Sequence, residues 1–178
     1  MERDFLKYFA SCVIKGFELT SRQRPYVYLE FGISIGGTFN EIAPLFDIAY
    51  AVDIDNCLSF IEHNSNLVWF NGTTDNFIKQ LSNVCFDYVF IDADHSYSQS
   101  LQDFKGILPF VRDNGFIVLH DTYPMTTAMM NMNVSGTVYK TAWDIRTQYN
   151  RQCEIITIPS EYGLSIIRKS DKQLHWID

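Results

Sequence analysis

The stretch Tyr26–Thr38, with the sequence YVYLEFGISIGGT, constrains the fold more than any other part of the chain. It begins with alternating aromatic and branched residues, a pattern typical of a buried strand. Glycines at positions 32, 36 and 37 then allow a sharp turn and a close approach of a ligand to the backbone. A helix-like run, FNEIA, follows, and its free N–H groups would face the same space. The stretch therefore predicts a strand, a tight turn and a helix that hold a nucleotide-like ligand.

Strands alternate with helices through most of the chain, which predicts an α/β domain with a largely parallel sheet. After the first strand, we expect strands at residues 47–53, 67–70, 86–91 and 116–119, and a closing antiparallel hairpin at 154–158 and 164–168. We expect helices at 2–19, 38–43, 56–64, 98–110 and 137–150, with a further helix capped by Thr73 or Thr74. Residues 114–115 predict a turn and residues 125–136 a mobile loop. No domain boundary is evident, so residues 1–178 are expected to form one domain.

The net charge of −7 argues against a nucleic-acid partner, because such binding depends on Lys and Arg side chains that neutralise phosphates. No apolar run is long enough to span a membrane. The N-terminus lacks the apolar core of a signal peptide, and the four cysteines are far apart with no CxxC pair. These features predict a cytoplasmic protein whose cysteines pack as small core residues.

Polar side chains follow each of the first five predicted strands. In an open α/β sheet the ligand binds beyond the carboxyl ends of the strands, so these side chains are expected to meet at one edge. Turns alone would explain one or two such positions, but not all five. The strand ends carry, in order, Glu30 with the glycines; Asp53 and Asp55; Gly72, Thr73, Thr74 and Asp75; Asp92, Asp94 and His95; His120 and Asp121.

Asp53 lies about 20 residues beyond the glycine turn, at the end of the next predicted strand. That position suits a carboxylate that accepts hydrogen bonds from the two hydroxyls of a ribose. A purely structural alternative, the capping of the next helix, suits Asp55 better. The glycine pattern argues against a dinucleotide, because G-x-G-x-x-G would require glycine where Ser34 stands. S-adenosylmethionine has no pyrophosphate and fits the pattern better.

Four segments in this order, LEFGISIGGT, AVDID, FIDADHSY and GFIVLHDTYP, resemble the class I S-adenosylmethionine-dependent methyltransferases. The resemblance is to the methyltransferase domain 24 type, related to the metal-dependent catechol, caffeoyl-CoA and macrolide-sugar O-methyltransferases, and it covers residues 25–170. It implies a Rossmann-like three-layer sandwich whose seven-stranded, mostly parallel sheet has an antiparallel last strand.

The resemblance also implies roles for individual residues. Glu30, Gly32, Gly36 and Thr38 would surround the methionine end of the cofactor, Asp53 would bind the ribose, and Thr74 and Asp75 would lie near the adenine. Asp92 and Asp121 match the aspartates that hold a divalent cation in metal-dependent relatives. The chain has Thr122 where those relatives have an asparagine ligand, and His120 is the candidate to replace it. The position of the catalytic base falls on His95.

The chemistry of these side chains supports the same roles. Two carboxylates and an imidazole can bind Mg²⁺ or another divalent cation, which would lower the pKa of a substrate hydroxyl. His95, beside Asp92, could then take the proton as the oxygen attacks the sulfonium methyl. A cap on the following helix is the alternative role for Asp94 and Ser96. The expected acceptor is a small hydroxylated molecule, such as a sugar or secondary metabolite.

Several questions stay open in the sequence. The methionines at positions 125, 129, 130 and 132 suit either an adaptable acceptor site or a packed segment without a role in recognition. A homodimer partner is one way to complete the site. Two other functions remain as alternatives, an NAD-dependent oxidoreductase on a similar sheet and a non-catalytic cofactor-binding domain, because fold alone does not determine function.

Overall fold

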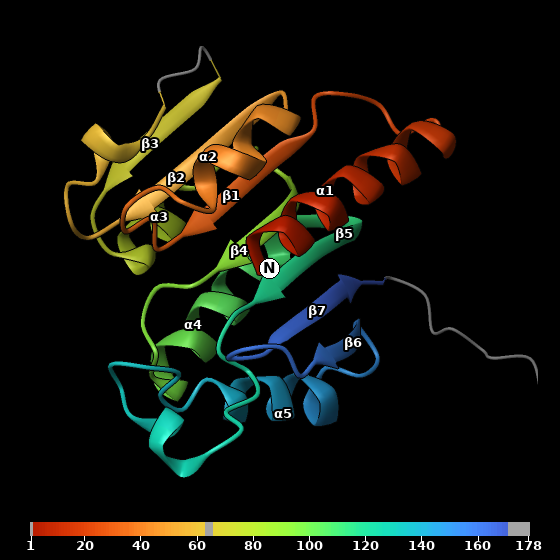
Figure 1. Ribbon diagram of the computed structural model, residues 1–178. Coiled ribbons are helices and arrows are strands. Elements are labelled where there is room, and N and C mark those ends of the chain that lie inside the picture. Colours follow the sequence, from red (N-terminus) through yellow and green to blue (C-terminus); the bar gives the residue numbers. More distant parts are fainter. Residues whose placement is uncertain (1, 63–65, 171–178) are drawn as a thin grey trace, which may run out of the picture.

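The computed structural model describes residues 2–62 and 66–170, and these form a seven-stranded sheet with helices on both faces (Figure 1). The strands are β1 (Val27–Phe31), β2 (Ile48–Asp53), β3 (Leu67–Asn71), β4 (Phe86–Ile91), β5 (Val111–Leu119), β6 (Cys153–Ile158) and β7 (Leu164–Lys169). Their order is β3-β2-β1-β4-β5-β7-β6. Strands β1 to β5 pair in parallel, whereas β7 is antiparallel to both of its neighbours. The predicted fold class is confirmed.

The helices are α1 (Glu2–Leu19), α2 (Phe39–Ile42), α3 (Thr74–Gln80), α4 (Tyr97–Ile107) and α5 (Tyr139–Gln148). Thr73 caps α3, as predicted, and Ser96 caps α4 by accepting a hydrogen bond from the backbone N–H of Gln99. Figure 1 shows α1 and α2 on one face of the sheet, while α3, α4 and α5 lie on the other. None of the helices in the described part of the chain has the length and apolar character that crossing a bilayer requires.

Successive side chains of β1 point to opposite faces of the sheet and contribute to two apolar clusters, one on each face. Tyr28 points into the apolar cluster beneath α1 and α2, where Leu6, Ala10, Val13 and Phe17 of α1 are also buried. Leu29 and Phe31 point into the opposite cluster, with Phe104 of α4 and other residues. All five residues of β1 are buried, which is the pattern of a central strand covered on both faces.

Two local predictions were wrong. The described part of the predicted helix at 56–64 forms only a 3₁₀ turn, Leu58–Phe60, and the Asn40 side chain binds the backbone at the last residue of this turn and two residues beyond it. Its amide donates to the Phe60 carbonyl at 2.8 Å and accepts from the Glu62 N–H at 2.9 Å, so the backbone is paired outside a helix. The predicted turn at 114–115 lies within β5, where the register against β4 shifts. The loop at 125–136 contains a 3₁₀ turn, Thr127–Met130.

Candidate functional site

The glycine turn after β1 is held in place by the end of β2. Asp53 accepts hydrogen bonds at Oδ2 from the backbone N–H groups of Ile33, at 2.7 Å, and Ser34, at 3.0 Å. Gly32 has a φ of +86°, and a Cβ there would lie 2.1 Å from the Asp92 carbonyl oxygen. Only glycine fits both the conformation and the space. The turn therefore packs closely against the ends of the two neighbouring strands, β2 and β4.

A cavity of about 610 Å³ opens at these strand ends. The glycine turn and Asp53 form one side, and the start of α3 forms another. Among the predicted cofactor residues, Gly32, Asp53, Thr74 and Asp75 line this cavity, together with the predicted catalytic residues Asp92 and His95. Sequence reasoning missed Gln99 of α4, which also lines it, because neither its type nor its position marks it as a ligand-binding residue.

Three of the predicted cofactor residues do not line this cavity. Gly36 packs against the backbone of Phe60, where a Cβ would lie 2.5 Å from the carbonyl oxygen. Thr38 lines a second cavity, of about 530 Å³, between the glycine turn and α1. Glu30 is buried, and its carboxylate accepts a hydrogen bond from the Tyr28 hydroxyl. Burial, with a smaller contribution from Asp92, raises the pKa of Glu30 well above its usual value.

Thr74 lines the 610 Å³ cavity, and Asp103 of α4 holds its side chain in place. Its hydroxyl donates to Asp103 Oδ1 at 2.6 Å, and Gln99 donates to the same oxygen at 2.9 Å. The other oxygen, Oδ2, is buried without a hydrogen-bond partner. Burial is the main cause that raises the pKa of Asp103 to about 6.

This raised pKa predicts a pH-dependent stability. The unfolded-state pKa of an aspartate is about 3.9, so the folded protein binds this proton more tightly between about pH 4 and 6. The contribution of Asp103 to the free energy of unfolding therefore falls as the pH rises through that window. We expect Asp103→Asn to be more stable than the parent at pH 7, by about 1 kcal/mol, and to lose this advantage near pH 4. Urea denaturation at several pH values, with the exposed Asp113→Asn as control, measures this; a destabilised variant at pH 7 would contradict it.

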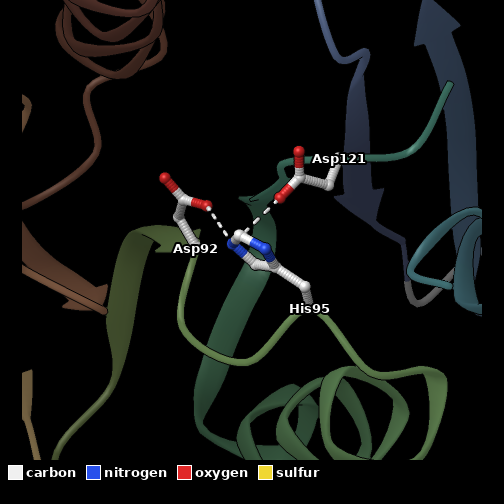
Figure 2. A group of neighbouring side chains, drawn as sticks. All are labelled: Asp92, His95 and Asp121. Carbon is white, nitrogen blue, oxygen red and sulfur yellow. Dashed lines mark ion pairs between the residues drawn. The ribbon is translucent and has the colours of Figure 1, made fainter. Parts of the chain in front are cut away.

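Beyond β4 and β5, Asp92, His95 and Asp121 converge, as Figure 2 shows. His95 Nε2 lies 3.3 Å from Asp121 Oδ2 and 4.0 Å from Asp92 Oδ1. Asp121 is only 3% exposed and has a φ of +62°, a left-handed conformation that aspartate tolerates better than most residues. Figure 2 shows the carboxylate of Asp121 facing His95. The sequence prediction that these strand ends meet is confirmed.

The ring of His95 is oriented by the loop that follows β5. Its Nδ1 lies 3.1 Å from the carbonyl oxygen of Met132, which can only accept, so Nδ1 carries the proton. Nε2 is then the atom that can take up a proton, and it faces Asp121. Gly136 packs on the backbone of His95, where a Cβ would lie 2.0 Å from the His95 carbonyl oxygen. No side-chain signal in the sequence could have identified the backbone of Met132 as this partner.

His120 lies beside the same two carboxylates. Its Nδ1 is 3.1 Å from Asp92 Oδ1 and 3.3 Å from Asp121 Oδ1, while Nε2 is 3.1 Å from Glu2 Oε2 of α1. Burial is the largest influence and lowers the pKa of His120, but Asp121, Asp92 and Glu2 together raise it to about 12. When no cation is bound, the protonated ring of His120 therefore carries a positive charge beside the carboxylates of Asp92, Asp121 and Glu2.

The residues present fit a divalent cation. Donor atoms of Asp92, His95 and Asp121 all lie within 4.8 Å of one another. His120 Nδ1, beside the same carboxylates, is buried and makes no well-formed hydrogen bond. The buried hydroxyl of Thr122 accepts a hydrogen bond from Ser165 at 2.9 Å, which uses one of its two lone pairs. His120 Nδ1 lies 3.1 Å and 3.3 Å from the two carboxylates, closer than His95 Nε2 at 4.0 Å and 3.3 Å.

A third cavity, of about 820 Å³, lies beside Thr122, between the loop after β5 and α5. Tyr123, Met130 and Trp143 contribute to its lining. Among the methionines of the loop, Met130 lines this cavity, whereas Met132 contributes its carbonyl oxygen to His95.

A family model described as a methyltransferase domain matches residues 42–122, the stretch that carries Asp53, the end of β4 and the end of β5. This match and the architecture confirm that the chain resembles the class I S-adenosylmethionine-dependent methyltransferases, with their Rossmann-like fold. No curated protein sequence matches the chain.

Solved structures of methyltransferases share the fold at low identity. The O-methyltransferase of Bacillus cereus, in complex with S-adenosylhomocysteine, is 16% identical with a TM-score of 0.71, over 95% of this chain and 80% of that one. TomG of Streptomyces achromogenes, an O-methyltransferase of tomaymycin synthesis in complex with S-adenosylmethionine, is 16% identical with a TM-score of 0.63, over 90% and 79%. MycE, from the mycinamycin biosynthetic pathway and in complex with Mg, S-adenosylhomocysteine and mycinamycin VI, is 17% identical with a TM-score of 0.63, over 92% and 50%.

Proposed function

We propose that this protein is an S-adenosylmethionine-dependent methyltransferase that methylates a hydroxyl of a small molecule, such as a sugar or secondary metabolite, with the help of a divalent cation. One observation carries the proposal: the 610 Å³ cavity extends from Asp53 and the glycine turn to Asp92 and His95. A cofactor in that cavity would have its ribose at Asp53 and its reactive end near the Asp92–His95–Asp121 cluster. The family match over residues 42–122 supports the same reading.

In this proposal the cofactor is recognised at both ends. Asp53 already binds the backbone of the turn through Oδ2, and its remaining lone pairs can accept hydrogen bonds from ribose hydroxyls. Thr74 and Asp75, at the start of α3, border the expected adenine position. Glu30, at the end of β1, does not line this cavity, and burial raises the pKa of its carboxyl. The ammonium group of the methionine end, if brought beside Glu30, would stabilise the charged carboxylate.

The transfer itself uses His95 as the base. His95 Nε2 would take the proton of the acceptor hydroxyl. S-adenosylmethionine, when bound, would supply the methyl group, which would pass to the acceptor oxygen as its bond to sulfur breaks. The imidazolium that forms is stabilised by the Asp121 carboxylate, 3.3 Å away. A divalent cation bound by Asp92 and Asp121 would lower the pKa of the acceptor hydroxyl. The products are a methyl ether and S-adenosylhomocysteine, and most of the catalytic effect comes from positioning.

Incubation with methyl-labelled S-adenosylmethionine and a panel of hydroxylated acceptors tests the proposal. We expect label in an acceptor ether, together with S-adenosylhomocysteine. Addition of EDTA should reduce the rate, and Mg²⁺ or Mn²⁺ should restore it. Full turnover in EDTA would remove the cation from the mechanism but not the methyl transfer. An absence of label with every acceptor, in a protein that still binds S-adenosylhomocysteine, would favour the non-catalytic cofactor-binding domain.

A further inference from the structure

The first turn of α1 reaches into the candidate site through Glu2. Its carboxylate lies 3.1 Å from His120 Nε2 and accepts a hydrogen bond from the Ser160 hydroxyl at 3.2 Å. The Glu2 side chain is only 11% exposed, so its contacts are made away from bulk water. The position of Glu2 is set by the docking of α1, whose buried residues include Leu6 and Ala10. Glu2 is therefore held at the site by the packing of α1.

The contact between Glu2 and His120 determines which ring nitrogen carries a proton. A carboxylate only accepts hydrogen bonds, so His120 Nε2 must carry the proton that it shares with Glu2. The other nitrogen, Nδ1, then points between Asp92 Oδ1, at 3.1 Å, and Asp121 Oδ1, at 3.3 Å. Nδ1 is buried and has no well-formed hydrogen bond. A cation bound by the two carboxylates would replace the proton on Nδ1 and use its lone pair.

We propose that Glu2 is a positioning residue that orients the His120 ring, so that Nδ1 joins Asp92 and Asp121 in binding a divalent cation. Histidines that bind metals commonly donate their second ring N–H to a carboxylate, which fixes the ring and makes the ligand nitrogen more basic. This inference rests on the proposed function, because it concerns the cation of that reaction.

The proposal assigns different tasks to the two histidines. His95 Nδ1 is taken by the Met132 carbonyl, so its Nε2 is left for proton transfer beside Asp121. His120 is more deeply placed, with its side chain 16% exposed against 30% for His95. The buried, fixed position of His120 suits a residue that binds a metal ion. The more exposed position of His95 suits a base, which must reach the acceptor hydroxyl. Glu2 thus links α1, far from β5 in the sequence, to the cation.

Mn²⁺ binding, followed by electron paramagnetic resonance, tests this without any turnover. We expect Glu2→Ala to weaken Mn²⁺ binding by about 10- to 100-fold, the usual effect of losing such a carboxylate. Glu2→Gln keeps an oxygen that can accept from His120 Nε2, so it should restore part of the affinity. Glu18→Ala, in the last turn of the same helix, removes an equal charge from an exposed ion pair with Arg24 and should leave Mn²⁺ affinity unchanged.

Spin-echo spectra of bound Mn²⁺ identify the ligand nitrogen. We expect a nitrogen coupling that disappears in His120→Gln and persists in His95→Gln. Equal Mn²⁺ affinities of Glu2→Ala and the parent would overturn the proposal, and so would an equal loss of Mn²⁺ affinity in Glu18→Ala. A nitrogen coupling that disappears in His95→Gln, or a parent protein that binds no Mn²⁺, would also overturn it. S-adenosylhomocysteine binding, measured on the same proteins, is expected to be unchanged by Glu2→Ala. A parent protein that does not bind S-adenosylhomocysteine would instead count against the proposed function.

Discussion

Asp53→Ala is expected to weaken S-adenosylhomocysteine binding by at least about 100-fold, because Asp53 has two tasks. Hydrogen bonds to charged groups contribute about 1.5–3 kcal/mol each, and two ribose hydroxyls would be lost as donors. The variant also leaves the backbone N–H groups of Ile33 and Ser34 without their acceptor, which loosens the glycine turn. Isothermal titration calorimetry measures the affinity.

Two further variants separate these tasks. Asp53→Asn keeps one acceptor oxygen, which can still bind the backbone N–H groups of the glycine turn. This variant should therefore preserve the conformation of the turn better than it preserves ribose binding. Asp113→Ala removes an exposed carboxylate elsewhere and should bind S-adenosylhomocysteine like the parent. An affinity of Asp53→Ala equal to that of the parent would show that the cavity does not hold the ribose at this position.

Asp121→Asn is expected to reduce turnover by about 1000-fold, within the range known for the loss of general acid–base catalysis, while S-adenosylhomocysteine affinity changes less than twofold. The variant removes the carboxylate charge beside His95 and one carboxylate of the proposed cation site. Asparagine is preferred to alanine here because it also tolerates the left-handed backbone at this position.

Comparison of kcat with cofactor affinity distinguishes a catalytic from a structural role for Asp121. Glu154→Gln, on β6 in an ion pair with Arg168, provides a charge-matched control that should keep full turnover. If Asp121→Asn lost cofactor binding and turnover together, Asp121 would have to be a structural support of the cavity. If turnover were unchanged, His95 would not depend on this carboxylate.

The sheet and its polar edge could be predicted from the sequence because both depend on local patterns. Apolar runs that end in an acid marked β2 and β4, and parallel strands necessarily bring their carboxyl ends to one edge. The meeting of Asp92, His95 and Asp121 follows from that rule and the order of the strands. The closing hairpin followed from its short turn.

Contacts between segments distant in the sequence could not be predicted in the same way. The pairing of Glu2 with His120 joins residues 118 positions apart, and it depends on where α1 docks. The carbonyl of Met132 carries no side-chain signal. In the described part of the predicted helix at 56–64, the Asn40 side chain binds the backbone at Phe60 and Glu62, a contact that local sequence does not indicate. Gly36 and Thr38 were assigned from the resemblance, which does not specify the shape of the cavity wall.

The most direct test of the cofactor assignment is a calorimetric titration of the parent protein with S-adenosylhomocysteine and, separately, with NAD. We predict one S-adenosylhomocysteine bound per chain and no binding of NAD, because Ser34 occupies the position where a dinucleotide turn needs glycine. Binding of NAD without any response to S-adenosylhomocysteine would contradict the account and favour an oxidoreductase.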